Sequence, residues 1–304
     1  MRWEDYRRSD NVEDRRDDGP SLGGMQLPIG TGGLGIGGLI VVGIIALALG
    51  VDPRMLIGNL DQVMNQPRYE QRYRVPPSTP TRTKAPPQDQ VGRFVSVVLA
   101  QTEDVWKQIF TEQNRRYEAP RLVLFSRSTQ SACGFAQSAT GPFYCPPDRR
   151  VYLDVAFFRE LGDRFSAPGE FAQAYVIAHE IGHHIQNLLG ILPRITEQRR
   201  TLPKAQSNAL SVRLELQADC FAGVWAYHAN ERFRILEAGD VEKALAAASA
   251  IGDDRLQQRQ RGFVVPDSFT NGTSQQRAAW FTTGLKSGQT SRCNTFARDA
   301  TPLN

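Results

Sequence analysis

Three residues near the middle of the chain have the types and the spacing of a catalytic metal site. His179, Glu180 and His183 follow the pattern His-Glu-x-x-His within Glu170–Leu189, a stretch whose periodicity predicts a helix. Residues four apart lie about 40° apart around a helix, so both imidazoles can reach one zinc ion from the same face. Glu180 lies beside the metal rather than on it, which suits a general base acting on zinc-activated water. Because the chain has only 4 His, two unrelated surface His at this spacing are the weaker interpretation.

A catalytic zinc site normally has three protein ligands, and here the third does not follow the motif directly. Residues 186–192 contain no His, which excludes the metzincin pattern. The next predicted helix, 205–230, carries Glu215 and Asp219 four residues apart among apolar side chains, where unpaired carboxylates are unfavourable. We therefore assign Glu215 as the third ligand and Asp219 as the acceptor that orients a ligating His. The alternatives are Asp219 on the metal, or an exposed acidic pair near Arg213.

Spacing says less about the other polar residues of the site. His184 lies about 140° around the helix from the first His of the motif, which favours a packing role over ligation. His228 falls on roughly the opposite face of its helix from the third ligand and is not expected to bind metal. The oxyanion of a tetrahedral intermediate needs a hydrogen-bond donor. The candidates for this role, or for contacts with substrate, are Tyr144, Tyr152 and Asn271.

The 4 Cys fall into two pairs that suit disulfide bonds in an oxidising compartment. Cys133 and Cys145 bound a short, turn-rich loop, and Cys220 and Cys293 connect the second predicted helix to the C-terminal part of the chain. The alternative is four reduced, mostly buried thiols. A zinc site made of Cys ligands is not expected, because the sequence has no Cys-x-x-Cys pair.

The elements predicted around these residues make a helix-dominated α+β domain with a small sheet. A long amphipathic helix is predicted over Val91–Tyr117, and β-rich runs follow at Arg121–Ser126 and Arg150–Val155. Another helix is predicted over Asp240–Arg259, and a last one starts at Thr273 with a capping box. The run Arg150–Val155 is predicted to be an exposed edge strand to which an extended substrate can add.

The N-terminal third has a different composition. Residues 1–28 are interpreted as a polar tail, because the first 18 carry 5 Arg and 7 Asp or Glu with almost no apolar periodicity. No charge appears from 19 to 51, and residues 29–51 are long and apolar enough to predict one transmembrane helix. A cleaved signal peptide is the alternative, with Ala46–Ala48 resembling a cleavage site. Residues 52–90 are interpreted as a juxtamembrane segment and Pro-rich linker, which leaves 91–304 as the catalytic domain.

Composition excludes several classes of protein. Hydrophobic residues make up 40% and charged residues 22% of the chain, which excludes a chain disordered throughout and a polytopic membrane protein. The net charge is only +4, and no dense basic run appears, so a nucleic-acid partner is not expected. The sequence shows no internal repeat, Gly-rich phosphate loop or nucleophile elbow.

The combination of motifs resembles a known family, the bacterial putative neutral zinc metallopeptidases. HEIGHH and LELQADC carry the resemblance, and YCPPDRRVYLD, VPDSFTNGTSQQRAAWF and CNTF support it. The resemblance implies a zincin-like catalytic domain, with His179, His183 and Glu215 on one zinc ion and Glu180 as the catalytic base. The Glu-x-x-x-Asp spacing also resembles that of gluzincins. Where the family has His before the Gly of F-T-x-G-T-S, this chain has Asn271.

The sequence thus predicts a membrane-anchored, zinc-dependent endopeptidase whose partners are a peptide or protein substrate and a membrane. Bridged Cys pairs favour a single-pass protein of the bacterial cytoplasmic membrane with its catalytic domain on the outer side. The alternative is a catalytically silent zinc-binding scaffold or peptide-binding protein. Glu180 separates the two, because a structural zinc site closes with four ligands and has no use for an adjacent base.

Overall fold

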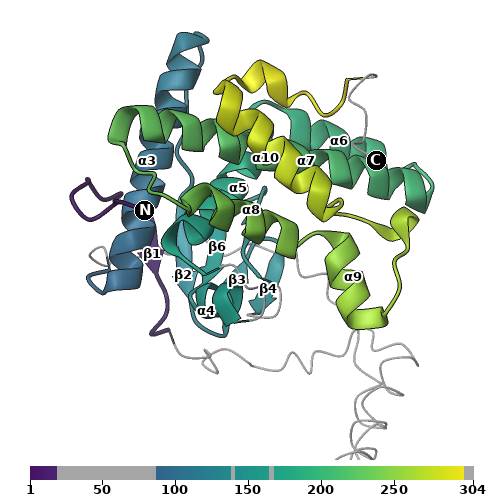
Figure 1. Ribbon diagram of the computed structural model, residues 1–304, viewed down its shortest axis with the longest axis horizontal. Coiled ribbons are helices and arrows are strands. Elements are labelled where there is room, and N and C mark those ends of the chain that lie inside the picture. The colour runs from purple at the N-terminus through teal and green to yellow at the C-terminus, as the bar shows by residue number, and fades with distance from the viewer. Residues whose placement is uncertain (19–86, 138–140, 164–167, 298–304) are drawn as a thin grey trace, which may run out of the picture. The chain divides into compact units, whose positions relative to one another are not determined.

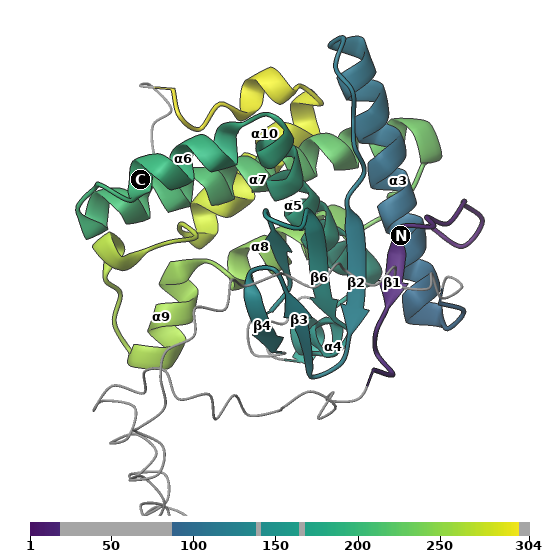
Figure 2. The same ribbon diagram turned by 180° about the vertical axis from the view of Figure 1, so that it is seen from behind.

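The described residues, 1–18, 87–137, 141–163 and 168–297, form a small mixed sheet with helices stacked on one of its faces (Figures 1 and 2). The structure is a computed structural model. Its strands are β1 Val12–Asp14, β2 Arg121–Phe125, β3 Ser128–Ser131, β4 Gly134–Gln137, β5 Phe143–Cys145 and β6 Arg150–Asp154. Its longer helices are α3 Gln90–Glu112, α4 Ala156–Asp163, α5 Glu170–Leu188, α6 Ile191–Arg199, α7 Lys204–Phe233, α8 Asp240–Ala250, α9 Asp253–Arg261 and α10 Ser274–Ser287, with 3-10 turns η3 Pro266–Ser268 and η4 Thr290–Cys293. The predicted helix-dominated α+β class is confirmed.

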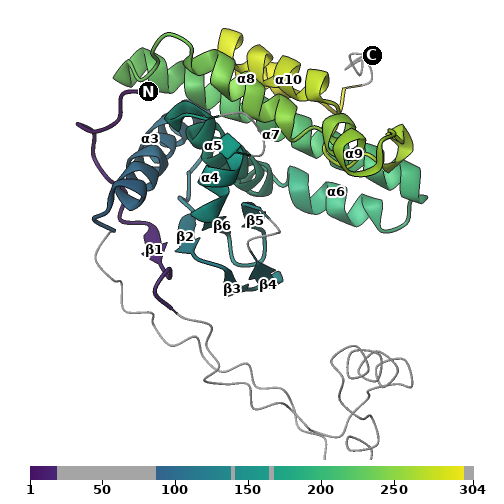
Figure 3. The same cartoon turned by 60° about the horizontal axis from the view of Figure 1, so that its bottom comes forward.

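The helices form two layers. Figure 3 shows α3 and α5 next to the sheet, and α7, α8 and α10 beyond them. The α7 and α10 backbones touch where two glycines meet: a Cβ on Gly223 would lie 2.1 Å from the carbonyl oxygen of Phe281, and one on Gly284 would lie 2.0 Å from that of Cys220. The helix that carries Glu215 is therefore clamped between α5 and α10.

The sheet is covered on both faces, which explains the unbroken apolar run of β2. Its strand order among the described residues is β1-β2-β6-β5, with β5 antiparallel to β6 and the other pairs parallel. Leu122 and Leu124 of β2 belong to the core beneath the helices, whereas Val123 and Phe125 pack with Ala136 of the β3–β4 hairpin on the other face. Strands buried on both faces lack the polar alternation of half-exposed strands.

One strand prediction is wrong. The sequence predicts an exposed edge at Arg150–Val155, but β6 lies inside the sheet between β2 and β5. The edge strand is β5, which has only three residues, Phe143–Cys145. A strand this short between turn-rich segments has too few positions for alternation to reveal it.

Helix predictions hold best where periodicity is long. The helices α5 and α7 lie within a few residues of their predicted bounds, and α10 begins with the predicted capping box at Thr273. The helix predicted over Asp240–Arg259 is instead two, α8 and α9, separated at Gly252. A Cβ at Gly252 would lie 2.5 Å from the backbone nitrogen of Ser274, so this backbone passes directly over the start of α10.

The N-terminal residues are part of the fold rather than a solvated tail. Met1 and Trp3 are buried, and Val12–Asp14 forms β1, which pairs in parallel with β2. The charges that suggested a tail have partners: Arg7 pairs with acidic residues of α3, and Arg16 bridges Asp14 and Asp89. Local charge density therefore misled the prediction, because these ion pairs connect residues far apart in sequence.

The predicted membrane location is wrong. Residues 29–51, the predicted span, lie outside the described residues. Residues 1–18 and 87–297 build one folded unit. Within the described part of the chain, no helix combines the length and the apolar character that a membrane crossing requires.

Candidate active site

Two neighbouring helices bring three candidate metal ligands together. His179 and His183 lie one turn apart on α5, and Glu215 projects from α7. Their ligand atoms all lie within 4.8 Å of one another. One Glu215 oxygen is 3.2 Å from Nε2 of His179, and the other is 3.5 Å from Nε2 of His183. Two imidazole nitrogens and one carboxylate oxygen form the donor set of many catalytic zinc sites, so these residues fit zinc.

A glycine between the two His allows α5 and α7 to approach this closely. A Cβ on Gly182 would lie 2.8 Å from the backbone oxygen of Ala218 and 2.9 Å from its Cα. Both atoms belong to the backbone of α7, which cannot give way as a flexible side chain can. Because Glu215 is three residues before Ala218 on the same helix, Gly182 sets the distance between the third candidate ligand and the two His.

A buried carboxylate holds the outer nitrogen of His179. Asp219 lies 2.8 Å from Nδ1 of His179 and accepts a hydrogen bond from the Tyr175 hydroxyl at 2.5 Å. Arg277 of α10 donates from Nε and Nη2 to the two Asp219 oxygens at 2.8 and 2.9 Å. A carboxylate can only accept, so the neutral His179 ring carries its proton on Nδ1 and presents Nε2 to the metal position.

The charges of the site are strongly coupled. Burial disfavours the charged forms, but the neighbouring Asp219 carboxylate raises the pKa of His179 to about 10. Burial also opposes ionisation of Glu215, yet the two His hold the pKa of that carboxyl well below its usual range. Burial raises the pKa of Glu180, and the two neighbouring His offset this effect only in part. The carboxylate beside the ligands is therefore a better proton acceptor than an exposed Glu.

Comparisons with known proteins agree with this geometry. The family described as "Putative neutral zinc metallopeptidase" matches residues 1–296. The chain belongs to this family. Among its relatives, "Uncharacterized protein YpfJ" of Escherichia coli (strain K12) is 49% identical over 302 residues, covering 98% of this chain and 99% of the relative. "Uncharacterized protein Rv2575" of Mycobacterium tuberculosis (strain ATCC 25618 / H37Rv) is 41% identical over 270 residues, covering 83% and 85%. No solved structure is significantly similar.

In this member of the neutral zinc metallopeptidase family, the candidate ligands open onto a cleft of about 430 Å³. Glu180 lines this cleft beside His179, His183 and Glu215. The β5 edge and the residues before it form one wall, whereas α6, α7 and the start of α9 contribute others. The walls are partly polar, and their apolar part includes Pro142, Phe143, Phe157, Val176, Leu192, Leu214, Ile251 and Leu256.

Tyr144, a candidate oxyanion donor, lines the cleft, but its hydroxyl is already engaged. His184 lies with Nε2 2.7 Å from the carbonyl oxygen of Glu118, so Nε2 must carry the ring proton. Burial lowers the pKa of His184 to about 4, which leaves its Nδ1 as an acceptor for the Tyr144 hydroxyl at 3.0 Å. Asn187 donates to the same hydroxyl at 2.9 Å. The predicted packing role of His184 agrees with this arrangement, which holds the β5 edge onto α5.

The other two oxyanion candidates differ in position. Tyr152 does not line the cleft; it donates to Asp148 at 2.7 Å, so the structure does not bring it to the site. Asn271 does line the cleft, on a loop whose backbone N–H groups at 270–272 donate to Asp253. Its side-chain amide also donates to Asp253, at 3.1 Å. Asn271 therefore stays a candidate for substrate contact.

The Cys residues and His228 lie outside the cleft. Disulfides join Cys133 to Cys145 and Cys220 to Cys293, which are the pairs that the sequence suggests. The first ties the β3–β4 hairpin to the end of β5, and the second ties η4 to α7. His228 lies 2.8 Å from the carbonyl oxygen of Gly288, on a part of α7 remote from Glu215.

Sequence reasoning missed two residues that touch the His179 side of the site, Arg277 and Tyr175. Both are buried and both contact Asp219. In each case the spacing of four residues from a neighbour on the same helix could have indicated that the side chain faces the site. Arg277 is four residues before the buried Phe281, so it lies on the apolar face of its helix, where a charge needs a partner. Tyr175 is four residues before His179, on the ligand face of α5.

Proposed function

We propose that this protein is a zinc-dependent endopeptidase that hydrolyses peptide bonds in a peptide or protein substrate. The observation that supports the proposal best is the position of Glu180: a buried carboxylate, unpaired with any cation among the described side chains, lines the cleft next to three residues with the donor set of a catalytic zinc site. A site that only stabilised structure would gain nothing from this buried charge. Family membership supports the same reaction class.

In this proposal each residue has a defined task. His179, His183 and Glu215 hold zinc, which when bound lowers the pKa of water and polarises a carbonyl group. Glu180 accepts the proton that the attacking water loses and later delivers it to the leaving nitrogen. The raised pKa of Glu180, which follows from its burial, suits both transfers. Asp219 keeps His179 in the tautomer that presents Nε2.

The β5 edge is the proposed binding surface for the substrate backbone. Residues Gly141–Tyr144 line the cleft, and β5 is the end strand of the sheet. An extended peptide can add to an exposed edge through main-chain hydrogen bonds. The apolar walls of the cleft then favour substrates with apolar side chains near the cleaved bond.

Changing Glu180 to Gln tests the proposal. The change keeps the size of the side chain but removes the proton acceptor, so cleavage of a casein-type substrate is expected to fall by about 100-fold or more. Zinc content, measured by elemental analysis, should not change. Glu197→Gln is the matched control, because Glu197 is exposed on α6 and its ion pair is with the exposed Arg200. Cleavage by Glu180→Gln at the level of the control would remove Glu180 from the role of base.

Changing Glu215 to Ala tests the ligand assignment separately. Loss of one of three ligands should remove zinc from the purified protein as well as activity. Asp219→Ala should retain more zinc than Glu215→Ala, because Asp219 acts through His179. Unchanged zinc stoichiometry in Glu215→Ala would show that Glu215 is not a ligand.

A further inference from the structure

The His183 side of the site rests on a buried chain of two amide side chains, Gln186 and Gln217. Oε1 of Gln186 lies 2.9 Å from Nδ1 of His183. Nε2 of Gln186 donates to the carbonyl oxygen of Leu214 at 2.7 Å and to Oε1 of Gln217 at 3.2 Å. Nε2 of Gln217 in turn donates to the carbonyl oxygen of Cys293 at 2.9 Å. Both Gln side chains are buried.

The backbone carbonyls at the two ends of this hydrogen-bond series determine which way each amide side chain is oriented. The carbonyl oxygens of Leu214 and Cys293 can only accept hydrogen bonds, so each Gln must point its NH2 group toward a carbonyl. Oε1 of Gln186 is then left facing His183 and can only accept. His183 must therefore carry its proton on Nδ1, which leaves Nε2 unprotonated on the side of Glu215. The backbone carbonyls of Leu214 and Cys293 thus determine the tautomer of His183: the first acts through Gln186, and the second acts through Gln217 and Gln186.

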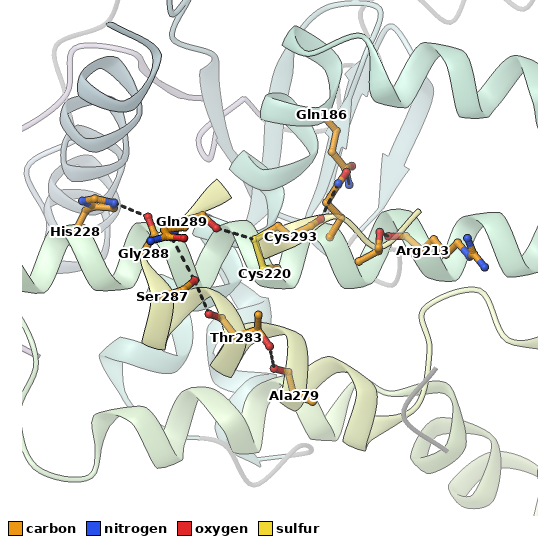
Figure 4. The surroundings of a disulfide bond; sticks show 12 residues. Gln186, Arg213, Cys220, His228, Ala279, Thr283, Ser287, Gly288, Gln289 and Cys293 are labelled. Carbon is orange, nitrogen blue, oxygen red and sulfur yellow. Dashed lines mark hydrogen bonds between the residues drawn. A yellow bond between two sulfur atoms is a disulfide. The ribbon is translucent and has the colours of Figure 1, made fainter. Parts of the chain in front are cut away.

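A disulfide holds the carbonyl group at the far end of this hydrogen-bond series in place. Cys293 is bonded to Cys220, and Figure 4 shows Gln186 extending from α5 toward this bond. Thr295, two residues further on, donates to the carbonyl oxygen of Arg213, which also ties this segment to α7. The carbonyl of Cys293 is therefore held at a fixed position on α7 by a covalent bond and a hydrogen bond.

Another buried Gln shows that burial alone does not produce such a network. Gln101 of α3 is as deeply buried as Gln186, but neither of its amide atoms has a hydrogen-bond partner among the described residues. Gln186 instead satisfies its carbonyl and its amide group, and one of its partners is a candidate ligand. A residue that served only packing would not need this set of contacts.

We propose that Gln186 is a positioning residue for His183, and that Gln217 and the disulfide-held carbonyl of Cys293 fix Gln186 in turn. The inference rests on the proposed zinc site. It makes the two ligating His unequal: a carboxylate orients His179, whereas a neutral amide orients His183. Residues that orient a ligating His through its second nitrogen commonly change metal affinity by about 10-fold to 100-fold when they are removed.

The test measures zinc affinity directly, by competition with a chromophoric chelator, so that it does not depend on peptidase activity. Gln186→Met keeps the volume of the side chain but removes its hydrogen bonds to His183, Leu214 and Gln217, and it should weaken zinc binding by about 10-fold to 100-fold. Gln101→Met is the matched control, because it removes a buried amide that has no hydrogen-bond partner in the described part of the chain and lies on a helix without candidate ligands. Its zinc affinity should equal that of the unmodified protein.

Two further measurements separate positioning from general damage. Gln217→Met leaves the contact between Gln186 and His183 in place and removes one of the two acceptors that hold the Gln186 amide, so it should weaken zinc binding less than Gln186→Met does. It also serves if Gln186→Met does not fold. In addition, the visible absorption spectrum of the cobalt-loaded protein should change in Gln186→Met and not in Gln101→Met, because the spectrum reports the geometry of the ligands.

The outcomes are distinct. If Gln186→Met and Gln217→Met both bind zinc as tightly as Gln101→Met, the positioning role is wrong even if the protein proves to be a peptidase. If the unmodified protein binds zinc with this dependence on Gln186 but never cleaves a peptide, the inference holds and the proposed function fails. If the unmodified protein does not bind zinc at all, both fail.

Discussion

Replacing Gly182 by Ala should weaken zinc binding more than it weakens the fold. The added Cβ would lie 2.8 Å from the backbone oxygen of Ala218, and ordinary contact begins at 3.4 Å, so α5 and α7 must separate by about 0.6 Å. Metal sites tolerate ligand displacements of about 0.2 Å. The separation moves Glu215 away from His179 and His183 by several times that tolerance.

The expected change in stability is smaller and has two opposing parts. Overpacking costs about 1 to 3 kcal/mol, whereas Ala in a helix interior is favoured over Gly by about 1 kcal/mol. The net loss in the free energy of unfolding of the zinc-free protein should therefore be at most about 2 kcal/mol. Zinc affinity should fall by at least about 10-fold, because the ligands no longer fit one ion.

Chelator competition and urea unfolding of the same samples provide the assay. Gly162→Ala is the matched control, because its Cβ would meet no described residue closer than 3.7 Å and its helix carries no candidate ligand. Gly223→Ala is the opposite control: its Cβ would clash at 2.1 Å with α10, so it should destabilise the fold strongly at the contact of α7 with α10 rather than with α5. If Gly182→Ala binds zinc within about 3-fold of Gly162→Ala, the reasoning about helix separation is refuted.

Two other perturbations test the charges of the site. Arg277→Met leaves the buried Asp219 without its bidentate cation and should lower the free energy of unfolding by about 3 to 5 kcal/mol; a loss below about 1 kcal/mol in urea unfolding would show that Arg277 is not needed to compensate this carboxylate. Zinc binding should release at least one proton near neutral pH, because the pKa of His179 without zinc is raised to about 10 and zinc needs the neutral ring. Zinc affinity should then rise as the pH is raised to about 10. In the zinc-free protein, protonated His179 stabilises the fold fully at pH values below the ordinary His pKa, and this stabilisation is lost as the pH is raised to about 10. Calorimetry in buffers of different ionisation enthalpy measures the released protons, and none released would contradict the predicted charge state.

The sequence predicts the three candidate ligands that the structure brings together, because helical spacing is local. His179 and His183 are brought together by one turn of helix, and Glu215 stands out as a carboxylate among apolar neighbours. Arg277 is 58 residues from Asp219, and no local pattern shows that their helices pack together. Only the physical requirement that a buried charge be paired links them, and that requirement does not name the partner.

The errors in the fold have the same physical origin. β1 has three residues and pairs with a strand more than 100 residues away, so neither periodicity nor turn chemistry marks it. The acidic and basic residues around it resemble a solvated segment until their partners are known. One missed long-range pairing thus turned a strand of the sheet into a predicted tail.

The run Leu214–Cys220 of α7 is buried except at the half-buried Glu215, and yet it is rich in polar groups. Within two turns it supplies the candidate ligand Glu215. The Leu214 carbonyl and the Gln217 side chain accept hydrogen bonds from Gln186 on the His183 side. The Asp219 carboxylate contacts His179, and Cys220 forms the disulfide to η4. Each group points to a different neighbour, on α5, α10 or η4, so a simple apolar stripe cannot describe this helix. Buried polar groups persist only where partners satisfy them. Each polar residue in such a run is therefore evidence for a specific contact, and Gln217, which periodicity alone treats as noise, is the residue through which the disulfide reaches the candidate zinc site.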